Sequence, residues 1–165
     1  MNDERIECAV LADADEIFAL YHSLIDMPGG TWDEEYPSKE IVEHDLAHHD
    51  VLVMRDVYGK IISAIVVEPM EDELAETEAD WYTDVQRWAE LSRLGVDKSM
   101  QGKGIAKKML LAAMDFCRER GYEAVRFLVS KSNPAPQRAY AKLNFDVCGE
   151  AYLYEHHWLC YQKRL

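Results

Sequence analysis

The sequence predicts one α/β or α+β domain over residues 1–165, in which a mixed central β-sheet is flanked by helices. Three observations support this class. Short apolar runs typical of strands alternate with segments of helical periodicity along the chain. Residues 88–143 follow the order strand, helix, strand, helix, which is typical of a layered sheet-and-helix fold. The length of 165 residues, with 48% hydrophobic and 30% charged residues, suits a single globular core.

The first half of the chain is predicted to contain a strand, two helices and a hairpin. Asp13 and Ser38 stand where a side chain can accept a hydrogen bond from a first-turn amide, so each is expected to cap a helix. Prolines and glycines between residues 27 and 37 mark the connection between these helices as a loop. Gly59 marks the hairpin turn. The expected elements are a strand at 5–10, helices at 14–25 and 39–49, and strands at 51–55 and 60–67.

The second half begins with a polar and acidic stretch at 69–84, which is expected to be a mobile excursion. Apolar residues then recur at helical spacing from Ile105 to Phe116, and Gly121 follows as a stop signal. The expected elements are a strand at 88–96, a helix at 105–120, a strand at 124–129, a helix at 133–143, and one or two last strands within 147–162.

Charge is distributed unevenly along the chain. The whole sequence has 31 acidic and 18 basic residues, a formal net charge of −13, yet residues 1–90 carry −19 and residues 91–165 carry +6. An acidic half attracts cations, and a basic half attracts phosphates. Nucleic acid is not an expected partner, because binding to its backbone relies on Lys and Arg. The acidic run at 71–80 could equally serve solubility alone.

The cellular compartment is also suggested by the sequence. No apolar run approaches the roughly 20 residues that a membrane helix needs, and residues 1–10 lack the basic and then apolar pattern of a signal peptide. The four cysteines include no C-x-x-C pair, so they are expected to be small buried thiols in a reducing compartment. We therefore expect a cytoplasmic protein that makes no contact with a membrane.

The segment between the strand at 88–96 and the following helix carries two glycines, Gly102 and Gly104. Without a Cβ, their backbone can approach a ligand closely, and the free amides of the first helical turn follow at once. Such an arrangement suits phosphate. The P-loop pattern is absent, and Lys107 stands where a dinucleotide-binding loop needs a small residue. A tight strand-to-helix turn without a ligand is the alternative.

This loop resembles the [RQ]-x-x-G-x-[GA] loop of the GNAT superfamily of acetyl-CoA-dependent N-acetyltransferases. The resemblance continues through Leu94-Gly95-Val96 before the loop, and through Asn133 and the run from Tyr140 to Phe145 after it. It covers residues 88–145 closely and the rest of the chain in element order. The segment from Trp32 to Pro37 looks like one in uncharacterised bacterial members. Asn144 replaces the usual glycine, but Asn also tolerates a left-handed helix end. The resemblance implies the GNAT fold, with splayed central strands.

The resemblance also implies how acetyl-CoA would be held, with no metal. The loop amides would bind the pyrophosphate, and the strand backbone at Leu94 and Val96 would pair with the pantetheine arm, while both side chains also serve the core. The Val96 amide would polarise the thioester carbonyl. Asn133 is expected to cap a helix and to lie beside the pantetheine, and Arg138 either reaches the 3′-phosphate or is a solvated charge. The implied loop residues are Gln101, Gly102, Lys103, Gly104, Ile105 and Ala106.

Two catalytic residues follow from the same resemblance. Tyr140 matches the general acid that protonates the departing coenzyme A thiolate. Glu90 resembles the strand glutamate used as general base in the histone acetyltransferase branch. Its even spacing from Val96 predicts that both side chains lie on one face of the sheet. Glu90 could equally be a strand-edge residue facing water, and three loop residues are rival bases. These are Glu34, Glu35 and Glu78.

The expected reaction is transfer of an acetyl group to a primary amine by direct attack. The acidic half suggests a cationic small-molecule or peptide amine, with Trp32, Glu35 and Tyr36 as candidate substrate contacts; the aromatic residues could instead be lids on the core. His44 and His48 could share a helix face, but no third metal ligand is evident. A catalytically silent acyl-CoA-binding regulatory module and a structural acidic adaptor are the rival functions. The resemblance is compatible with a homodimer.

Overall fold

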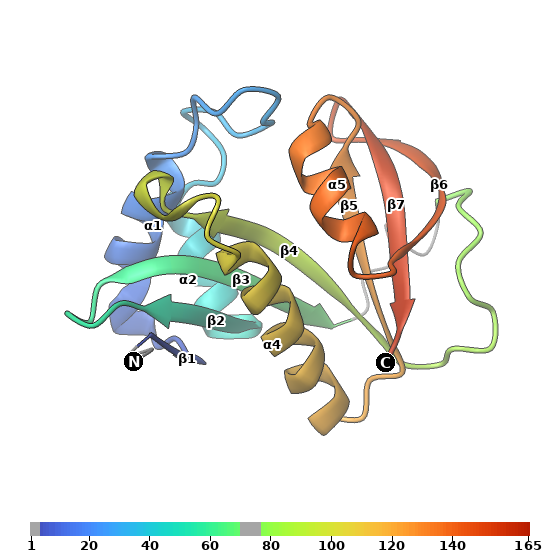
Figure 1. Cartoon of the computed structure of the whole chain (residues 1–165), viewed down its shortest axis with the longest axis horizontal. Coiled ribbons are helices and arrows are strands. Elements are labelled where there is room, and N and C mark those ends of the chain that lie inside the picture. Colours follow the sequence, from blue (N-terminus) through green and yellow to red (C-terminus); the bar gives the residue numbers. More distant parts are fainter. Residues whose placement is uncertain (1–3, 70–76) are drawn as a thin grey trace.

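A seven-stranded mixed sheet forms the centre of the computed structural model, which describes residues 4–69 and 77–165 (Figure 1). The strand order is β1-β2-β3-β4-β5-β7-β6. Neighbouring strands are antiparallel except for β4 and β5, which are parallel. The strands are β1 (Arg5–Cys8), β2 (Asp50–Arg55), β3 (Ile61–Pro69), β4 (Trp88–Val96), β5 (Ala124–Ser130), β6 (Asp146–Leu153) and β7 (His156–Arg164).

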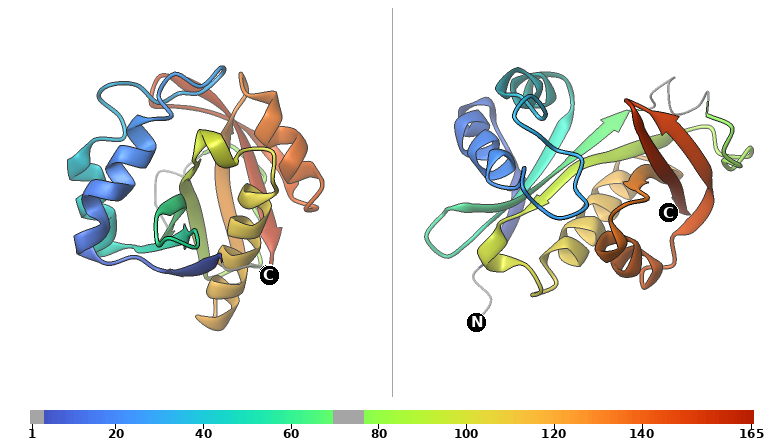
Figure 2. Two further views of the ribbon diagram at one scale, coloured as in Figure 1. Left: turned by 60° about the vertical axis from the view of Figure 1, so that its left-hand side comes forward. Right: turned by 90° about the horizontal axis from the view of Figure 1, so that it is seen from above.

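Helices cover both faces of the sheet (Figure 2). α1 (Ala14–His22) and α2 (Lys39–His48) pack on one face, and α4 (Ile105–Glu119) and α5 (Pro134–Ala141) pack on the other. Short 3₁₀ turns precede α1 and α4. Among the described helices, none has the length and apolar character needed to cross a bilayer. This architecture confirms the predicted mixed sheet flanked by helices.

Alternate residues of the central strands supply the two halves of the core. Ile65 and Val67 of β3 pack towards α4, whereas Ala64 and Val66 pack towards α1 and α2. This period-2 division is what a strand buried on both faces requires. A third apolar cluster, around Trp81 and Trp88, lies beneath residues 77–85 on the α1 and α2 side of the sheet.

The predicted elements are found, with differences at their ends. Ser38 caps α2 by accepting a hydrogen bond from the Ile41 amide at 3.2 Å. Asp13 and Asn133 occupy N-cap positions, but neither side chain makes the expected cap bond. Asp13 instead accepts from the Val10 amide and from Arg55, because the 3₁₀ turn before α1 places its carboxylate there. Residues 70–76 of the expected mobile excursion lie outside the described residues, and 77–84 form neither helix nor strand.

The strands β4 and β5 pair over a short distance and then separate. Their parallel register runs from Trp88 opposite Ala124 to Glu90 opposite Arg126. Beyond that point β4 stays paired with β3 and β5 stays paired with β7. The predicted splay of the central strands is therefore confirmed, and Figure 1 shows it as a V whose open end lies beside the starts of α4 and α5.

The loop between α1 and α2 crosses the open end of this V. On the β4 side, Asp26 accepts a hydrogen bond from Lys98 at 2.5 Å. On the β5 side, the Ser132 hydroxyl donates to the Gly29 carbonyl at 3.1 Å. Gly29 has a φ of +74°, and a Cβ there would lie 2.6 Å from the Ser132 carbonyl oxygen. Only glycine fits such a close approach, so this loop links the two diverging strands.

Candidate active site

The glycine loop leads directly into α4 beside the open end of the V. Gly102 and Gly104 both have φ of +78°, and Gly104 is the N-cap residue of α4. The first helical hydrogen bond runs from the Lys108 amide to the Gly104 carbonyl at 3.1 Å. In the described structure, no acceptor outside the helix meets the amides of residues 102–107. The loop and first turn therefore present unused donors at the positive end of a fifteen-residue helix, which suits an anion.

Some side chains around this loop make hydrogen bonds or ion pairs with neighbouring elements, and other basic side chains are exposed. The Gln101 amide nitrogen donates to the Val96 carbonyl at 3.0 Å, so this side chain fastens the loop to the end of β4. Lys108 pairs with Glu4 at 3.2 Å and Lys98 with Asp26. Lys103 and Lys107 are exposed. The loop thus keeps exposed positive charge close to its amides.

A β-bulge interrupts β4 where it leaves β5. Ser92 lies opposite Val66 and Gly95 lies opposite Ala64, so β4 contains one residue more than β3 over this interval. The extra residue has a left-handed backbone, since Arg93 has a φ of +47°. A bulge of this kind reverses the alternation of side chains along the strand that follows it.

The bulge corrects one prediction about the site. Leu94 and Val96 pack against the core on the α4 side. Ser92 aligns with Val66, which belongs to the core on the α1 and α2 side, and Glu90 lies two residues earlier on the same face. The expectation that Glu90 and Val96 share a face is therefore wrong, because simple alternation does not count the inserted residue. The two ends of β4 present these side chains to opposite sides of the V.

Tyr140 lies on α5 with its ring in the aromatic core on the α4 side. Its ring meets Phe127 edge-on at 4.9 Å between centroids and lies 6.0 Å from the ring of Tyr161. The residue is 9% exposed, and its hydroxyl has no hydrogen-bond partner in the described part of the chain. Burial raises the pKa of Tyr140 to about 12. The phenol is thus a neutral donor with an unused hydrogen.

Glu90 is half-buried and belongs to a polar row that crosses the sheet. It lies opposite Glu68 of β3 and Arg126 of β5. The rival bases are all exposed, and Glu34 lies 3.7 Å from His22 on α1. Glu90 is therefore the candidate base closest in register to the point where the strands part. The exposed rivals are Glu34, Glu35 and Glu78.

The three candidate substrate contacts behave differently. Trp32 is half-buried and packs edge-on against the ring of Tyr21 at 5.0 Å, so it serves the core. Glu35 is exposed, and its amide donates to Asp33. Tyr36 is 38% exposed, and its hydroxyl accepts a hydrogen bond from Arg93 at 3.2 Å. Of the three, Tyr36 is the one that the structure joins to β4.

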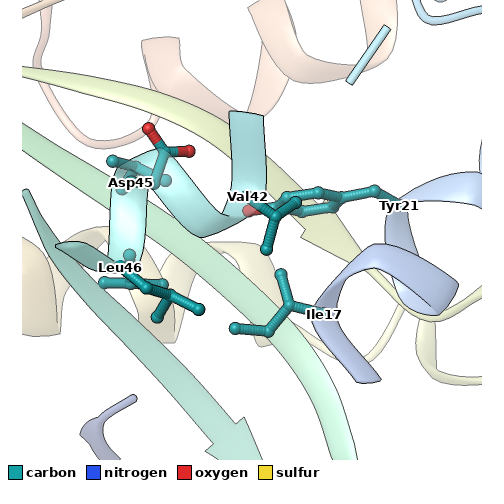
Figure 3. Close-up of a pocket in the computed structure, with 7 residues that line it drawn as sticks. Ile17, Tyr21, Val42, Asp45 and Leu46 are labelled. Atoms are coloured by element: carbon teal, nitrogen blue, oxygen red, sulfur yellow. The ribbon is translucent and has the colours of Figure 1, made fainter. Parts of the chain in front are cut away.

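A buried ionic cluster beside the bulge escaped sequence reasoning. Arg93 binds both oxygens of Asp45 at 2.6 and 2.7 Å and one oxygen of Glu68 at 2.6 Å. Figure 3 shows Asp45 turning its carboxylate away from the apolar pocket formed by Ile17, Val42 and neighbouring side chains. Asp45 is 2% exposed, although it belongs to a helix with several acidic residues. No sequence signal joined residues 48 positions apart.

Burial and charge act in opposite directions on Arg93. Burial alone would lower its pKa, but the hydrogen bonds to Asp45 and the nearby Tyr36, Asp45 and Glu68 raise the pKa well above its ordinary value. The guanidinium is therefore permanently charged. Beside it, His49 Nε2 lies 3.6 Å from Glu68, while His49 Nδ1 is buried with no partner among the described residues.

His44 and His48 share a face of α2 as the sequence suggests, but the group of potential metal ligands is a different one. His44 and His48 have ring centroids 4.6 Å apart, but the ligand atoms that come within 4.8 Å of one another belong to His44, Asp45 and His49. Arg93 already occupies both oxygens of Asp45. A metal ion at this place would have to compete with a guanidinium.

The cofactor-binding residues predicted on α5 lie at the open end of the V. Asn133 is half-buried, and without a cap bond its side chain is available to a ligand. Pro134 takes the first helical position. Arg138 is exposed one helical turn further along. Asn144 has a φ of +60°, which confirms that it replaces glycine in a left-handed turn.

Known proteins resemble this chain in sequence and in fold. Mycothiol acetyltransferase of Rhodococcus erythropolis is 36% identical over 53 residues, which are 32% of this chain and 18% of that protein, so the match spans much less than two thirds of the relative. A GNAT-family acetyltransferase of Streptococcus agalactiae superposes with a TM-score of 0.81 at 20% identity, over 98% of this chain and 95% of that one.

Two further solved structures contain the predicted acyl donor. A phosphinothricin acetyltransferase of Sinorhizobium meliloti, in complex with acetyl-CoA, has a TM-score of 0.76 at 18% identity, over 99% of this chain and 89% of that one. The yncA protein of Salmonella typhimurium, also with acetyl-CoA, has a TM-score of 0.75 at 19% identity, over 99% and 95%. The model of the acetyltransferase (GNAT) family matches residues 17–145, more than half of the chain. The chain belongs to the GNAT family of acetyltransferases, and the predictions of this family, of its fold and of an acyltransferase are confirmed.

Proposed function

We propose that this protein transfers an acetyl group from acetyl-CoA to a primary amine by direct attack. The observation that carries the proposal is the V between β4 and β5, which opens next to unused amides at the start of α4. A diphosphate suits those amides, and an extended thioester arm suits the edge of β4 that β5 leaves unpaired. Family membership and the two relatives with acetyl-CoA support the same donor.

The donor is proposed to lie on the α4 and α5 side of the V. The amides of residues 101–106 would hold the pyrophosphate, and the backbone at Leu94 and Val96 would pair with the pantetheine arm. The Val96 amide would polarise the thioester carbonyl as negative charge develops on its oxygen. Asn133, whose side chain makes no cap bond, would lie beside the arm, and Arg138 would meet the 3′-phosphate.

The acceptor is proposed to enter from the α1 and α2 side, where Glu90 lies. Glu90 first takes a proton from the ammonium, which frees the electron pair on the nitrogen. The neutral nitrogen attacks the carbonyl carbon, the carbon–sulfur bond breaks, and Tyr140 gives a proton to the departing sulfur. The second proton that the nitrogen loses on becoming an amide returns to Tyr140 through water. Ser92 Oγ is buried on the same face as Glu90 and has no partner among the described residues. It can therefore bind the amine, or a water molecule between the amine and Glu90.

The acceptor is proposed to be cationic before it loses its proton. Glu68 and Glu90 lie opposite each other on neighbouring strands, and together with Asp45 they outnumber the arginines on this face, Arg93 and Arg126, so the face is negative on balance. A polyamine, an amino sugar or a peptide amine would meet this requirement.

The four cysteines are free thiols, which supports a cytoplasmic setting for the reaction.

A thiol-release assay with acetyl-CoA and a panel of amines tests the proposal. Turnover with at least one amine is expected, and coenzyme A binding in calorimetry without thiol release from any amine would favour the silent regulatory module instead. Tyr140→Phe should lower kcat by roughly ten-fold or more while coenzyme A affinity is kept; unchanged turnover would remove Tyr140 from the mechanism. Glu90→Gln should alter the pH–rate profile, and an intact profile would place the base elsewhere.

A further inference from the structure

The backbone of Arg93 is strained and yet held firmly. A left-handed φ is unfavourable for a residue such as arginine, and the φ of +47° occurs at the single residue that β4 inserts relative to β3. Such conformations persist where the surroundings over-determine them. The contacts of Arg93 show which parts of the molecule do so here.

The side chain of Arg93 is fixed by three different elements. Its guanidinium binds Asp45 of α2 through two nitrogens and Glu68 of β3 through one, at 2.6–2.7 Å. It also donates to the Tyr36 hydroxyl in the loop between α1 and α2, at 3.2 Å. The paired geometry with Asp45 fixes direction as well as distance. The guanidinium therefore links the bulge to the elements that surround the proposed acceptor side of the V.

The main chain of Arg93 is fixed from a fourth element. The hydroxyl of Tyr21, a fully buried residue of α1, donates to the Arg93 carbonyl at 2.7 Å. The Tyr21 ring also packs closely against Gly95, two residues further along β4, because a Cβ on Gly95 would lie 3.1 Å from the ring. Side chain and backbone of the inserted residue are thus both held in place.

We propose that Arg93 is a positioning residue for acetyl transfer, because it maintains the bulge that lets one strand serve two substrates. Before the bulge, Glu90 and Ser92 face the acceptor side. After it, Leu94 and Val96 face the donor side. If the bulge relaxed, the alternation would reverse, and the Val96 amide and Glu90 would lose their relative placement. This role rests on the proposed function.

The experiment compares two arginines that share a chemistry and differ in place. Arg55 of β2 also binds two carboxylates, Glu7 at 2.5 Å and Asp13 at 2.9 Å, but it lies two strands away from the V. Arg93→Gln and Arg55→Gln therefore each remove a guanidinium that binds two carboxylates, although Glu7 is more exposed than either partner of Arg93. Steady-state thiol release with acetyl-CoA gives kcat and KM, calorimetry gives coenzyme A affinity, and circular dichroism checks the fold.

Arg93→Gln is expected to lower kcat about 10- to 100-fold, while acetyl-CoA KM and coenzyme A affinity stay within about three-fold, because misplacing reacting groups slows transfer more than it weakens binding. Arg55→Gln is expected to leave kcat within about three-fold. Asp45→Asn should reproduce the Arg93→Gln effect, and the double variant should be no slower than either single one. Equal kcat losses in the two arginine variants would overturn the proposal.

Tyr21→Phe tests the same idea if Arg93→Gln does not fold. It removes one hydroxyl and keeps the ring, and it should lower kcat several-fold at unchanged coenzyme A affinity. A kcat equal to that of the wild type would overturn the main-chain half of the proposal. A wild-type protein that releases no thiol with any amine would overturn the proposed function, and with it the kinetic role of Arg93. An active wild type with unaffected variants would overturn the role of Arg93 alone.

Discussion

Two arginines with largely enclosed side chains, one on each of the diverging strands, are stabilised in different ways. Arg93 of β4 is neutralised by Asp45 and Glu68. Arg126 of β5 lies on the same face and is 4% exposed, but in the described part of the chain it has no carboxylate within ion-pair distance. It lies over the rings of Trp81 and Trp88, at 4.8 and 4.2 Å, and donates one hydrogen bond to the Tyr82 carbonyl.

The electrostatic consequences are opposite. Burial lowers the pKa of Arg126 and outweighs the opposing effect of Cys148, and the Nε of Arg126 is buried without a partner in the described structure. The pKa of Arg93 is raised, because its partners outweigh its burial. The β4 side of the V is therefore held by charge pairs of fixed geometry, and the β5 side by aromatic contacts that tolerate small shifts. The side with the bulge has the more directional support.

The largest expected effect is on stability when each arginine is replaced by Met. Arg93→Met leaves two buried carboxylates without a counter-charge and should lower the free energy of unfolding by about 3–5 kcal/mol. Arg126→Met leaves no such charge and should change it by about 1 kcal/mol or less. Urea unfolding followed by circular dichroism measures both. A larger loss for Arg126 than for Arg93 would reverse the comparison.

A smaller loss of stability is expected when an added methyl group crowds the β4 side of the V. Gly95→Ala would place a Cβ 3.1 Å from both the Tyr21 ring and Leu24, and should lower the free energy of unfolding by about 1–3 kcal/mol. Adding Leu24→Ala makes room, so the double variant should lose less than the sum of the single losses. Additive losses in urea unfolding would show that the Gly95 site is looser than its contacts indicate.

The smallest expected effect concerns the pH dependence of kcat, and it tests the consequence of burying the Tyr140 phenol. Burial favours the neutral form of Tyr140, as it does for Arg126, and raises the phenol pKa to about 12. Tyr140 therefore stays protonated between about pH 6 and pH 10. The kcat profiles of wild type and Tyr140→Phe over this range should differ in height and share one shape. An alkaline decline that disappears in Tyr140→Phe would mean that the phenol ionises within the range.

Local signals in the sequence predict much of this structure. The glycine loop and the left-handed turn at Asn144 follow from turn chemistry that acts within a few residues, whereas the splayed strands are expected from the resemblance to the GNAT superfamily. The caps show the limit, because Ser38 caps as expected, whereas Asp13 is drawn to Arg55 on a distant strand. A single local rule could not include that competing partner.

The bulge and its ionic cluster could not be predicted, for a related reason. Alternation along β4 assumes one residue per pairing step, and nothing near Arg93 marks an insertion. The partners that make the insertion stable, Asp45 and Tyr21, come from helices 48 and 72 positions away. Their contribution exists only once α1 and α2 pack on the sheet. The assignment of Glu90 and Val96 to one face failed at this point.

The short seam between β4 and β5 has a practical consequence. Three residue pairs join these strands in the described structure, so the sheet consists of two smaller sheets that share a narrow border. A molecule that occupies the gap contacts both, and its binding free energy adds to the resistance of the whole chain to heating. The melting temperature in the presence of coenzyme A therefore offers a label-free way to rank acceptor amines before any product is known.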